Sequence, residues 1–152
     1  MPRIKHVAAV LNSAGGTWIK SIDAVEVAAR HLKQGLQRYD VKSPAEFESA
    51  FAAVTKNHTS AIVILDDPML IANFKALADL AIKHRLPAIG FTGFANAGGL
   101  MTSGPNLVEL WRRQAYFVDK IMKGGNPATI PIEQPTRFEL AINLKTAKAQ
   151  LD

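Results

Sequence analysis

The sequence has 152 residues, of which 48% are hydrophobic and 20% charged, and its formal net charge is +5 at pH 7. This composition is typical of a globular chain that buries roughly 70% of its unfolded surface, and no apolar run approaches the roughly 18 residues of a membrane span. The absence of cysteine excludes disulfides, thiolate catalysis and cysteine-based zinc sites. Basic residues are scattered over every expected helix, which favours a solvated surface over a nucleic-acid partner.

Strand-like runs alternate with helical patterns along the chain, as in repeated βαβ units. Strands are expected at residues 7–11, 36–41, 61–65, 87–91, 100–102 and 138–143. Helices are expected up to residue 33, after Ser43, and over residues 69–84, 106–122 and 144–151. We therefore expect residues 1–152 to form a single α/β domain, with a three-layer, doubly wound, mainly parallel sheet of the flavodoxin-like kind.

Local signals mark where some of these elements begin and end. Gly35 is expected to stop the first helix, and Ser43 with Glu46 forms the pattern of a capping box. Residues 106–122 carry a long apolar seam that includes Trp111, and we expect this seam to be buried. Prolines punctuate residues 124–137, which predicts an extended connector rather than a helix or a central strand.

Small polar residues follow several of the expected strands. Residues 86–110 hold two short apolar runs that end in such residues, at 92–96 and at 102–106. Ligands of open α/β sheets bind outside the carboxyl ends of the strands, so a binding edge is expected here. Asp66 and Asp67 end a third run. Adjacent acids point apart on an extended backbone, so at most one is expected to face the cleft, with turn chemistry before Pro68 as the alternative.

The loop after the first expected strand contains Asn12, Ser13 and Gly15, but it matches neither the phosphate-binding loop nor the dinucleotide fingerprint. A plain turn is favoured, and a hydrogen bond from Asn12 or Ser13 to a small ligand stays open. Phe94 follows a glycine at the binding edge, so ligand stacking and core packing both stay open. The histidines are too far apart in sequence to suggest a metal site, and no serine lies in a nucleophile elbow.

Four blocks of sequence resemble a known family in the same order. They are KHRLPAIGF at 83–91, AGGLMTSGPNL at 97–107, VDKIMKG at 118–124 and NPATIPIEQPTRFELAINLKTAKAQ at 126–150. The chain is similar to ABC transporter substrate-binding proteins with the type I periplasmic binding fold, in the branch related to tryptophan- and tyrosine-binding proteins. Members have two α/β lobes that close around a ligand, and this sequence corresponds to the second lobe and the C-terminal segment. The first lobe is then missing.

The resemblance implies positions for the cleft and the hinge. The implied cleft residues are Asn12, Ser13, Asp66, Asp67, Thr92, Gly93 and Phe94, and the implied hinge residues are Gly99, Thr102, Ser103 and Gly104. The family often has an aromatic residue before the glycine of Thr102-Ser103-Gly104, and its absence here weakens the case for an aromatic amino-acid ligand.

The leading functional expectation is a solute-binding component of an ABC importer, or an isolated lobe of one. It would hold a small polar or amino-acid-like molecule without catalysis, cofactor or metal, and the resemblance implies a transporter permease as a partner. The helix at 106–122 would lack its family partner, so we expect a homodimer through this helix, which the protomers would exchange. The resemblance implies an extracytoplasmic location. The run at 7–11 is too short for a secretory signal, so a cytoplasmic location is expected if this chain is the natural product.

Two other functions stay open. In a phosphoacceptor receiver domain, Asp66 would accept the phosphoryl group and Thr92 would follow the fourth strand, but Asn12 and Ser13 stand where an acidic pair is needed. That fold also expects a lysine after the fifth strand, where Ser103 to Pro105 stand. A nucleotide-linked enzyme on a flavodoxin-like sheet ranks last, since the phosphate loops are poor and no acid–base pair is evident.

Overall fold

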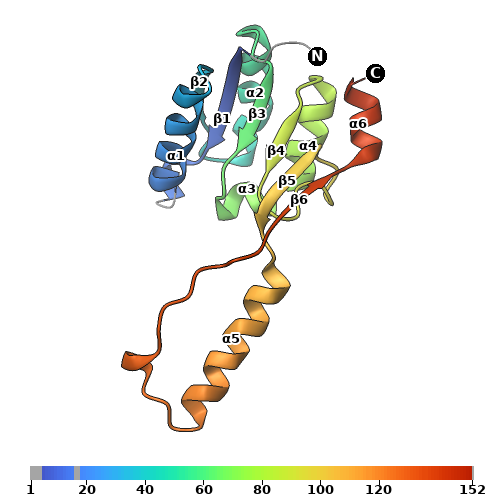
Figure 1. Cartoon of the computed structure of the whole chain (residues 1–152). Coiled ribbons are helices and arrows are strands. Elements are labelled where there is room, and N and C mark those ends of the chain that lie inside the picture. The colour runs from blue at the N-terminus through green and yellow to red at the C-terminus, as the bar shows by residue number, and fades with distance from the viewer. Residues whose placement is uncertain (1–4, 16–17, 152) are drawn as a thin grey trace.

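The computed structural model describes residues 5–15 and 18–151, and a six-stranded sheet forms its centre (Figure 1). The strands are β1 (His6–Leu11), β2 (Gly35–Asp40), β3 (Ala61–Ile64), β4 (Ala88–Gly90), β5 (Met101–Pro105) and β6 (Phe138–Ile142). They lie in the order β2-β1-β3-β4-β5-β6. Neighbours from β2 to β5 are parallel, and β6 is antiparallel to β5. The mainly parallel α/β fold expected from the sequence is confirmed.

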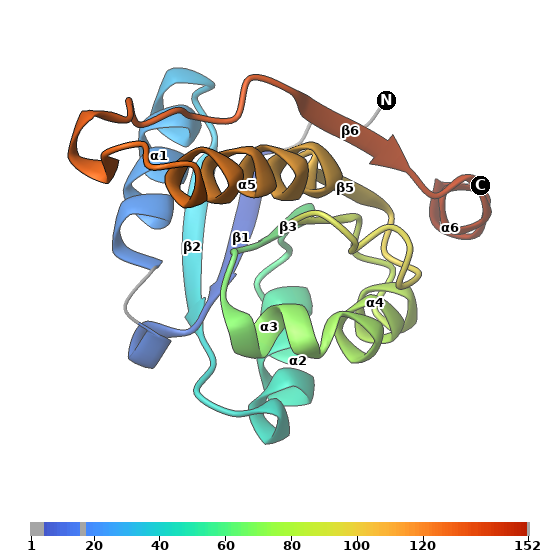
Figure 2. The same ribbon diagram turned by 90° about the horizontal axis from the view of Figure 1, so that it is seen from below.

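Helices flank this sheet unequally. They are α1 (Trp18–His31), α2 (Phe47–Lys56), α3 (Pro68–Ala72), α4 (Phe74–Lys83), α5 (Leu107–Met122) and α6 (Leu144–Leu151), with short 3-10 turns at Ser13–Gly15, Pro44–Glu46 and Pro127–Thr129. In Figure 2, α1 lies on one side of the sheet while α2, α3 and α4 lie on the other. The helix α6 packs beside α4, where the Gln150 amide donates to the Ala81 carbonyl.

Three local expectations about helix ends are wrong. The helix expected at 69–84 is broken at Asn73 into α3 and α4. Ser43 makes no side-chain cap, and the Glu46 carboxylate instead accepts from the Lys42 N–H at 2.9 Å, so the capping box does not form. After α1 the left-handed position is taken by Lys33, with φ 54°, while Gly35 already lies in β2.

The buried apolar cluster is larger on one face of the sheet than on the other. Facing α2 and α4, Val10, Ile62 and Ile64 are at most 2% exposed and pack around Phe51. On the opposite face, α1 buries only a small cluster: Ala9, Leu11, Ile22 and Leu65. Since α1 covers this cluster alone, the sheet beyond it toward β6 stays partly open among the described residues.

The helix α5 and the connector after it extend away from the sheet (Figure 1). None of the described α5 residues is buried, and Trp111 is 60% exposed, so the expected burial of the seam is wrong for this structure. The connector runs back along α5, where Arg113 pairs with Glu133 across a groove of about 350 Å³. On the side of α5 that faces away from the connector, no other described segment packs. None of the described helices combines the length and apolar character needed to cross a membrane.

Candidate ligand-binding edge

The parallel register brings the loops after β1, β2 and β3 to one edge of the sheet. Val10 is aligned with Ile64, and Leu11 with Asp40, so the residues that follow these strands are neighbours. Asn12 lies against the loop after β3, where its Nδ2 donates to Asp67 Oδ1 at 3.3 Å. The side-chain Oδ1 of Asn12 accepts from the Ala14 N–H at 3.1 Å, and the two hydrogen bonds together fix the orientation of the side-chain amide.

The two adjacent carboxylates after β3 have different surroundings. Asp67 is 2% exposed and caps α3, accepting from the N–H groups of Met69 at 2.8 Å and Leu70 at 3.3 Å. Asp66 is exposed and forms no ion pair with any residue that the structure describes. Asp67 therefore fastens the edge, while the Asp66 carboxylate is accessible to a solute.

Ser13 is bound to a residue that sequence reasoning missed. Its N–H donates to Asp40 Oδ1 at 2.7 Å, and its hydroxyl donates to Oδ2 of the same carboxylate. Burial raises the pKa of Asp40, but the two hydrogen bonds from Ser13 and the charge of Lys42 outweigh it and lower the pKa overall. The signal for Asp40 was its place at the end of a strand next to β1.

Thr92 and Gly93 follow β4 and lie beside the end of β5. The Thr92 hydroxyl donates to the Pro105 carbonyl at 3.2 Å, and a Cβ at Gly104 would overlap that hydroxyl. Gly93 has φ 100° and open space around its Cα, so a side chain there would be strained by backbone conformation rather than by crowding. Both residues are half-buried at the edge.

The Phe94 ring lies inside the protein. It has no exposed surface and packs edge-on against Phe74, with ring centroids 5.2 Å apart. A Cβ at Gly90 or Gly99 would overlap the ring, so both glycines make room for it. Of the two roles left open for Phe94, the structure gives it core packing.

The residues expected to form a hinge lie within the folded body. Gly99 is buried beside Phe94, Thr102 is aligned with both β4 and β6, and Ser103 and Gly104 are aligned with β6. The Thr102 hydroxyl donates to the Phe91 carbonyl at 2.5 Å and lies 3.3 Å from the Gly90 carbonyl, tying β5 to β4. The chain leaves the sheet only after Pro105 and returns at Phe138, which is aligned with it.

A shallow hollow of about 350 Å³ adjoins the edge on the α1 side of the sheet. Its lining includes Ser21, Val25, Asp66, Phe91, Ser103 and Phe138. Apolar side chains dominate it, with Asp66 supplying the negative charge at the rim. The residues described here contain no cluster of histidine and acidic side chains able to hold a metal ion.

Comparisons with known proteins agree on the fold. A crystal structure of a conserved domain protein from Vibrio cholerae superposes with a TM-score of 0.87 at 19% identity, covering 97% of this chain and 50% of that one. An ABC domain in complex with L-Trp from Streptococcus pneumoniae gives 0.86 at 19% identity, with the same coverage. A ligand-free, open substrate-binding protein with adhesive properties from Clostridium difficile gives 0.76 at 16% identity, covering 98% and 50%.

The chain thus spans about half the length of these three structures. No curated protein sequence matches it. The family model described as ABC transporter substrate binding protein matches residues 1–151. Because this match covers nearly the whole sequence, the chain belongs to the family of ABC transporter substrate-binding proteins.

Proposed function

We propose that this chain is a solute-binding component of an ABC importer, or one lobe of such a component, and that it holds a small polar, amino-acid-like ligand at the edge after β1, β3 and β4. The family match over residues 1–151 carries this proposal. The L-Trp complex among the similar structures supports an amino-acid-like ligand. The same match favours solute binding over a receiver domain phosphorylated at Asp66.

The proposed contacts come from residues with different surroundings. The Asp66 carboxylate is exposed and without an ion partner, which suits a ligand ammonium group. Ser13 and Thr92 offer hydroxyl groups at the same edge, and Gly93 leaves open space beside Thr92. Asn12 is 8% exposed and its side-chain amide is paired with Asp67 and the Ala14 N–H, so we propose that it positions the edge. Asp67 and Phe94 act from behind this surface, since one caps α3 and the other packs in the core.

A single lobe supplies one wall of such a site. Ligand pockets bury most of a small molecule's surface, so this wall alone binds weakly and a second wall is needed for tight binding. We propose that a second copy associates through α5 and that the assembly works with a transporter permease. The family is typically extracytoplasmic, and we propose the same location for this protein.

A thermal-shift screen against amino acids and small carboxylates tests the proposed ligand class. A ligand that binds only the folded state stabilises it by mass action, by about 2.7 kcal/mol when the ligand is at 100 times its Kd. The unfolding temperature rises accordingly. We expect at least one amino acid to raise it, and Asp66→Asn to abolish that response. Asp79→Asn, on the exposed surface of α4, is the matched control. A flat response across the panel, or an unchanged response in Asp66→Asn, would contradict the proposed site.

A further inference from the structure

One face of the sheet presents a continuous apolar surface that the described helices leave uncovered. Register places Val63, Ile89, Met101 and Ile142 in one row across β3, β4, β5 and β6. Val63 borders the small cluster under α1. We call the following residues the open sheet face: Val63, Ile89, Met101, Leu140 and Ile142. Each is half-buried or exposed, whereas their neighbours on the α2 side, such as Ile62 and Ala88, are at most 2% exposed. Val63 and Ile89 of this face also line the hollow beside α1.

The helix α5 presents a second apolar surface. Its exposed residues Val108, Trp111, Ala115, Val118 and Met122 are spaced by three and four positions, and we call them the outer stripe. Such spacing aligns side chains along one face of a helix. Trp111 and Val118 are each 60% exposed. The opposite side of α5 faces the connector, so the outer stripe has no partner among the described residues.

The two surfaces match in size and charge. Four strands at the usual spacing are about 14 Å across, enough for one helix of about 10 Å diameter beside α1. The outer stripe is about 21 Å long, comparable to strands of five residues at about 17 Å. Asp66 lies at the rim of the hollow, Arg112 lies next to the stripe, and neither forms an ion pair with a described residue.

Docking within one molecule is opposed by the way α5 is held. The helix points away from the sheet (Figure 1), and its base is braced where the chain leaves and returns. The Asn106 N–H donates to the Arg137 carbonyl at 3.1 Å, and the Asn106 amide donates to Glu139 at 2.6 Å. Arg137 also pairs with Glu109 at 2.9 Å. Folding α5 back onto its own sheet would break these contacts, whereas a second copy supplies both surfaces at once.

We propose that the outer stripe of α5 docks onto the open sheet face of a second copy, and that the exchange is reciprocal about a two-fold axis. This inference deepens the self-association in the proposed function and rests on it. Arg112 of one copy lies beside Asp66 of the other, so each helix forms a wall next to the other molecule's ligand-binding edge. Each α5 thereby supplies the helix that covers the open sheet face of the other copy.

Disulfide trapping tests this arrangement cleanly, because the sequence contains no cysteine. Two variants, Val118→Cys in the stripe and Ser103→Cys in the hollow, are purified separately, mixed and oxidised. Ser103 is exposed and close in size to cysteine, so its replacement leaves the fold intact. We expect a disulfide between the two variants, identified by intact mass. Ser49→Cys, an equally exposed position on α2, replaces Ser103→Cys in the control mixture and is expected to give no such product.

Other products would overturn the assignment in distinct ways. Cross-linking of Val118→Cys to itself would show that two α5 helices pair with each other. Closure of a Ser103→Cys, Val118→Cys double variant within one chain would show docking in cis. Sedimentation of the wild-type chain as a monomer at high micromolar concentration, with no cross-link, would refute the self-association as well. A ligand-induced thermal shift of the wild-type chain, measured at a concentration at which it sediments as a monomer, reports on ligand binding separately from self-association.

Discussion

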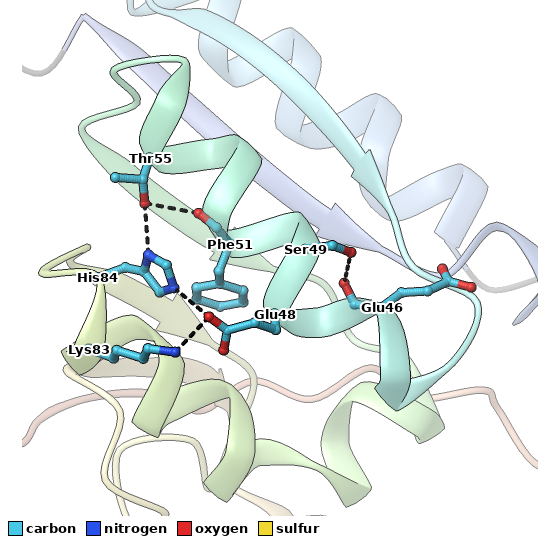
Figure 3. A network of polar contacts seen from close by, with 7 residues as sticks. All are labelled: Glu46, Glu48, Ser49, Phe51, Thr55, Lys83 and His84. Carbon is cyan, nitrogen blue, oxygen red and sulfur yellow. Dashed lines mark hydrogen bonds and ion pairs between the residues drawn. The ribbon is translucent and has the colours of Figure 1, made fainter.

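Glu48 illustrates how a few surface groups fasten one helix to another (Figure 3). Its carboxylate on α2 accepts from Lys83 Nζ at 2.6 Å and lies 3.3 Å from His84 Nε2, at the end of α4. The Thr55 hydroxyl donates to the Phe51 carbonyl, and His84 Nδ1 lies 3.1 Å from the same hydroxyl. The hydrogen bond from Lys83 is the main cause that lowers the pKa of Glu48.

This lowered pKa predicts the direction of an acid effect. A carboxyl group whose pKa falls on folding stabilises the folded state above its ordinary value of 4.5, and this contribution is lost as pH falls through the folded value. We expect Glu48→Gln to lower the urea midpoint at pH 6 and to match the wild type near pH 3. Asp23→Asn, exposed on α1 and outside the described ion pairs, should show no such convergence. Parallel pH curves for Glu48→Gln and wild type would contradict the prediction.

Residue identities alone indicated which positions lie at the edge, but not what each side chain does there. Asp66 and Asp67 are chemically alike, and only the start of α3 separates a cap from an exposed carboxylate. The burial of Phe94 depends on space left by Gly90, the last residue of β4, and by Gly99, two residues before β5. Asp40 was missed because its partner, Ser13, is 27 residues away. Such pairings are long-range and leave no local pattern.

At the scale of elements, α3 depends on its cap. The helix is five residues long, so its first N–H groups are a large share of its backbone donors. Asp67 satisfies two of them and also accepts from Asn12. Losing this carboxylate leaves buried donors unpaired.

We expect Asp67→Ala to destabilise the protein by about 1–3 kcal/mol, from the lost cap and the orphaned Asn12 amide. The neighbouring Asp66→Ala is the matched control and should change stability by less than about 0.5 kcal/mol, as exposed substitutions usually do. Chemical denaturation of both variants measures the difference. Equal losses in the free energy of unfolding would contradict the special role of the Asp67 cap.

Strands were easier to predict from the sequence than helix ends. Each expected strand overlaps an observed one, because apolar runs bounded by turn residues are a strong signal. The break at Asn73 was not visible in the apolar pattern of 69–84, since α3 and α4 both face the same core. The antiparallel direction of β6 was not predicted either, because direction depends on the path of the chain through 106–137.

At the scale of the whole molecule, α5 is an amphipathic helix with water on its apolar side. The sequence predicted the helix, but the apolar seam that it defined was too broad. Leu110 and Phe117 face the groove toward the connector, while Val108 and Ala115 join the exposed stripe. The difference comes from the connector, whose position no helical pattern encodes.

The exposure of Trp111 predicts a concentration-dependent fluorescence signal. The sequence has two tryptophans, so Trp18→Phe leaves Trp111 as the single reporter. As association buries the indole, we expect its emission maximum to move to shorter wavelength with rising protein concentration. Adding Val118→Asp to this variant places a charge in the outer stripe and should keep the maximum unshifted. An unchanged spectrum in a sample that sediments as a dimer would place Trp111 outside the interface.

The antiparallel pairing of β5 and β6 has one more consequence. Pro105 is aligned with Phe138. The next two residues toward α5 and the connector, Asn106 and Arg137, are joined by a backbone hydrogen bond of 3.1 Å. The two ends of the intervening path of 32 residues, 106–137, are therefore already as close as the ends of a β-turn. Topologically the excursion is an insertion in a hairpin, so a short turn in its place would leave the six-stranded order of the sheet intact. We therefore expect that residues 106–137, which include α5, can be replaced without loss of the sheet and its ligand-binding edge.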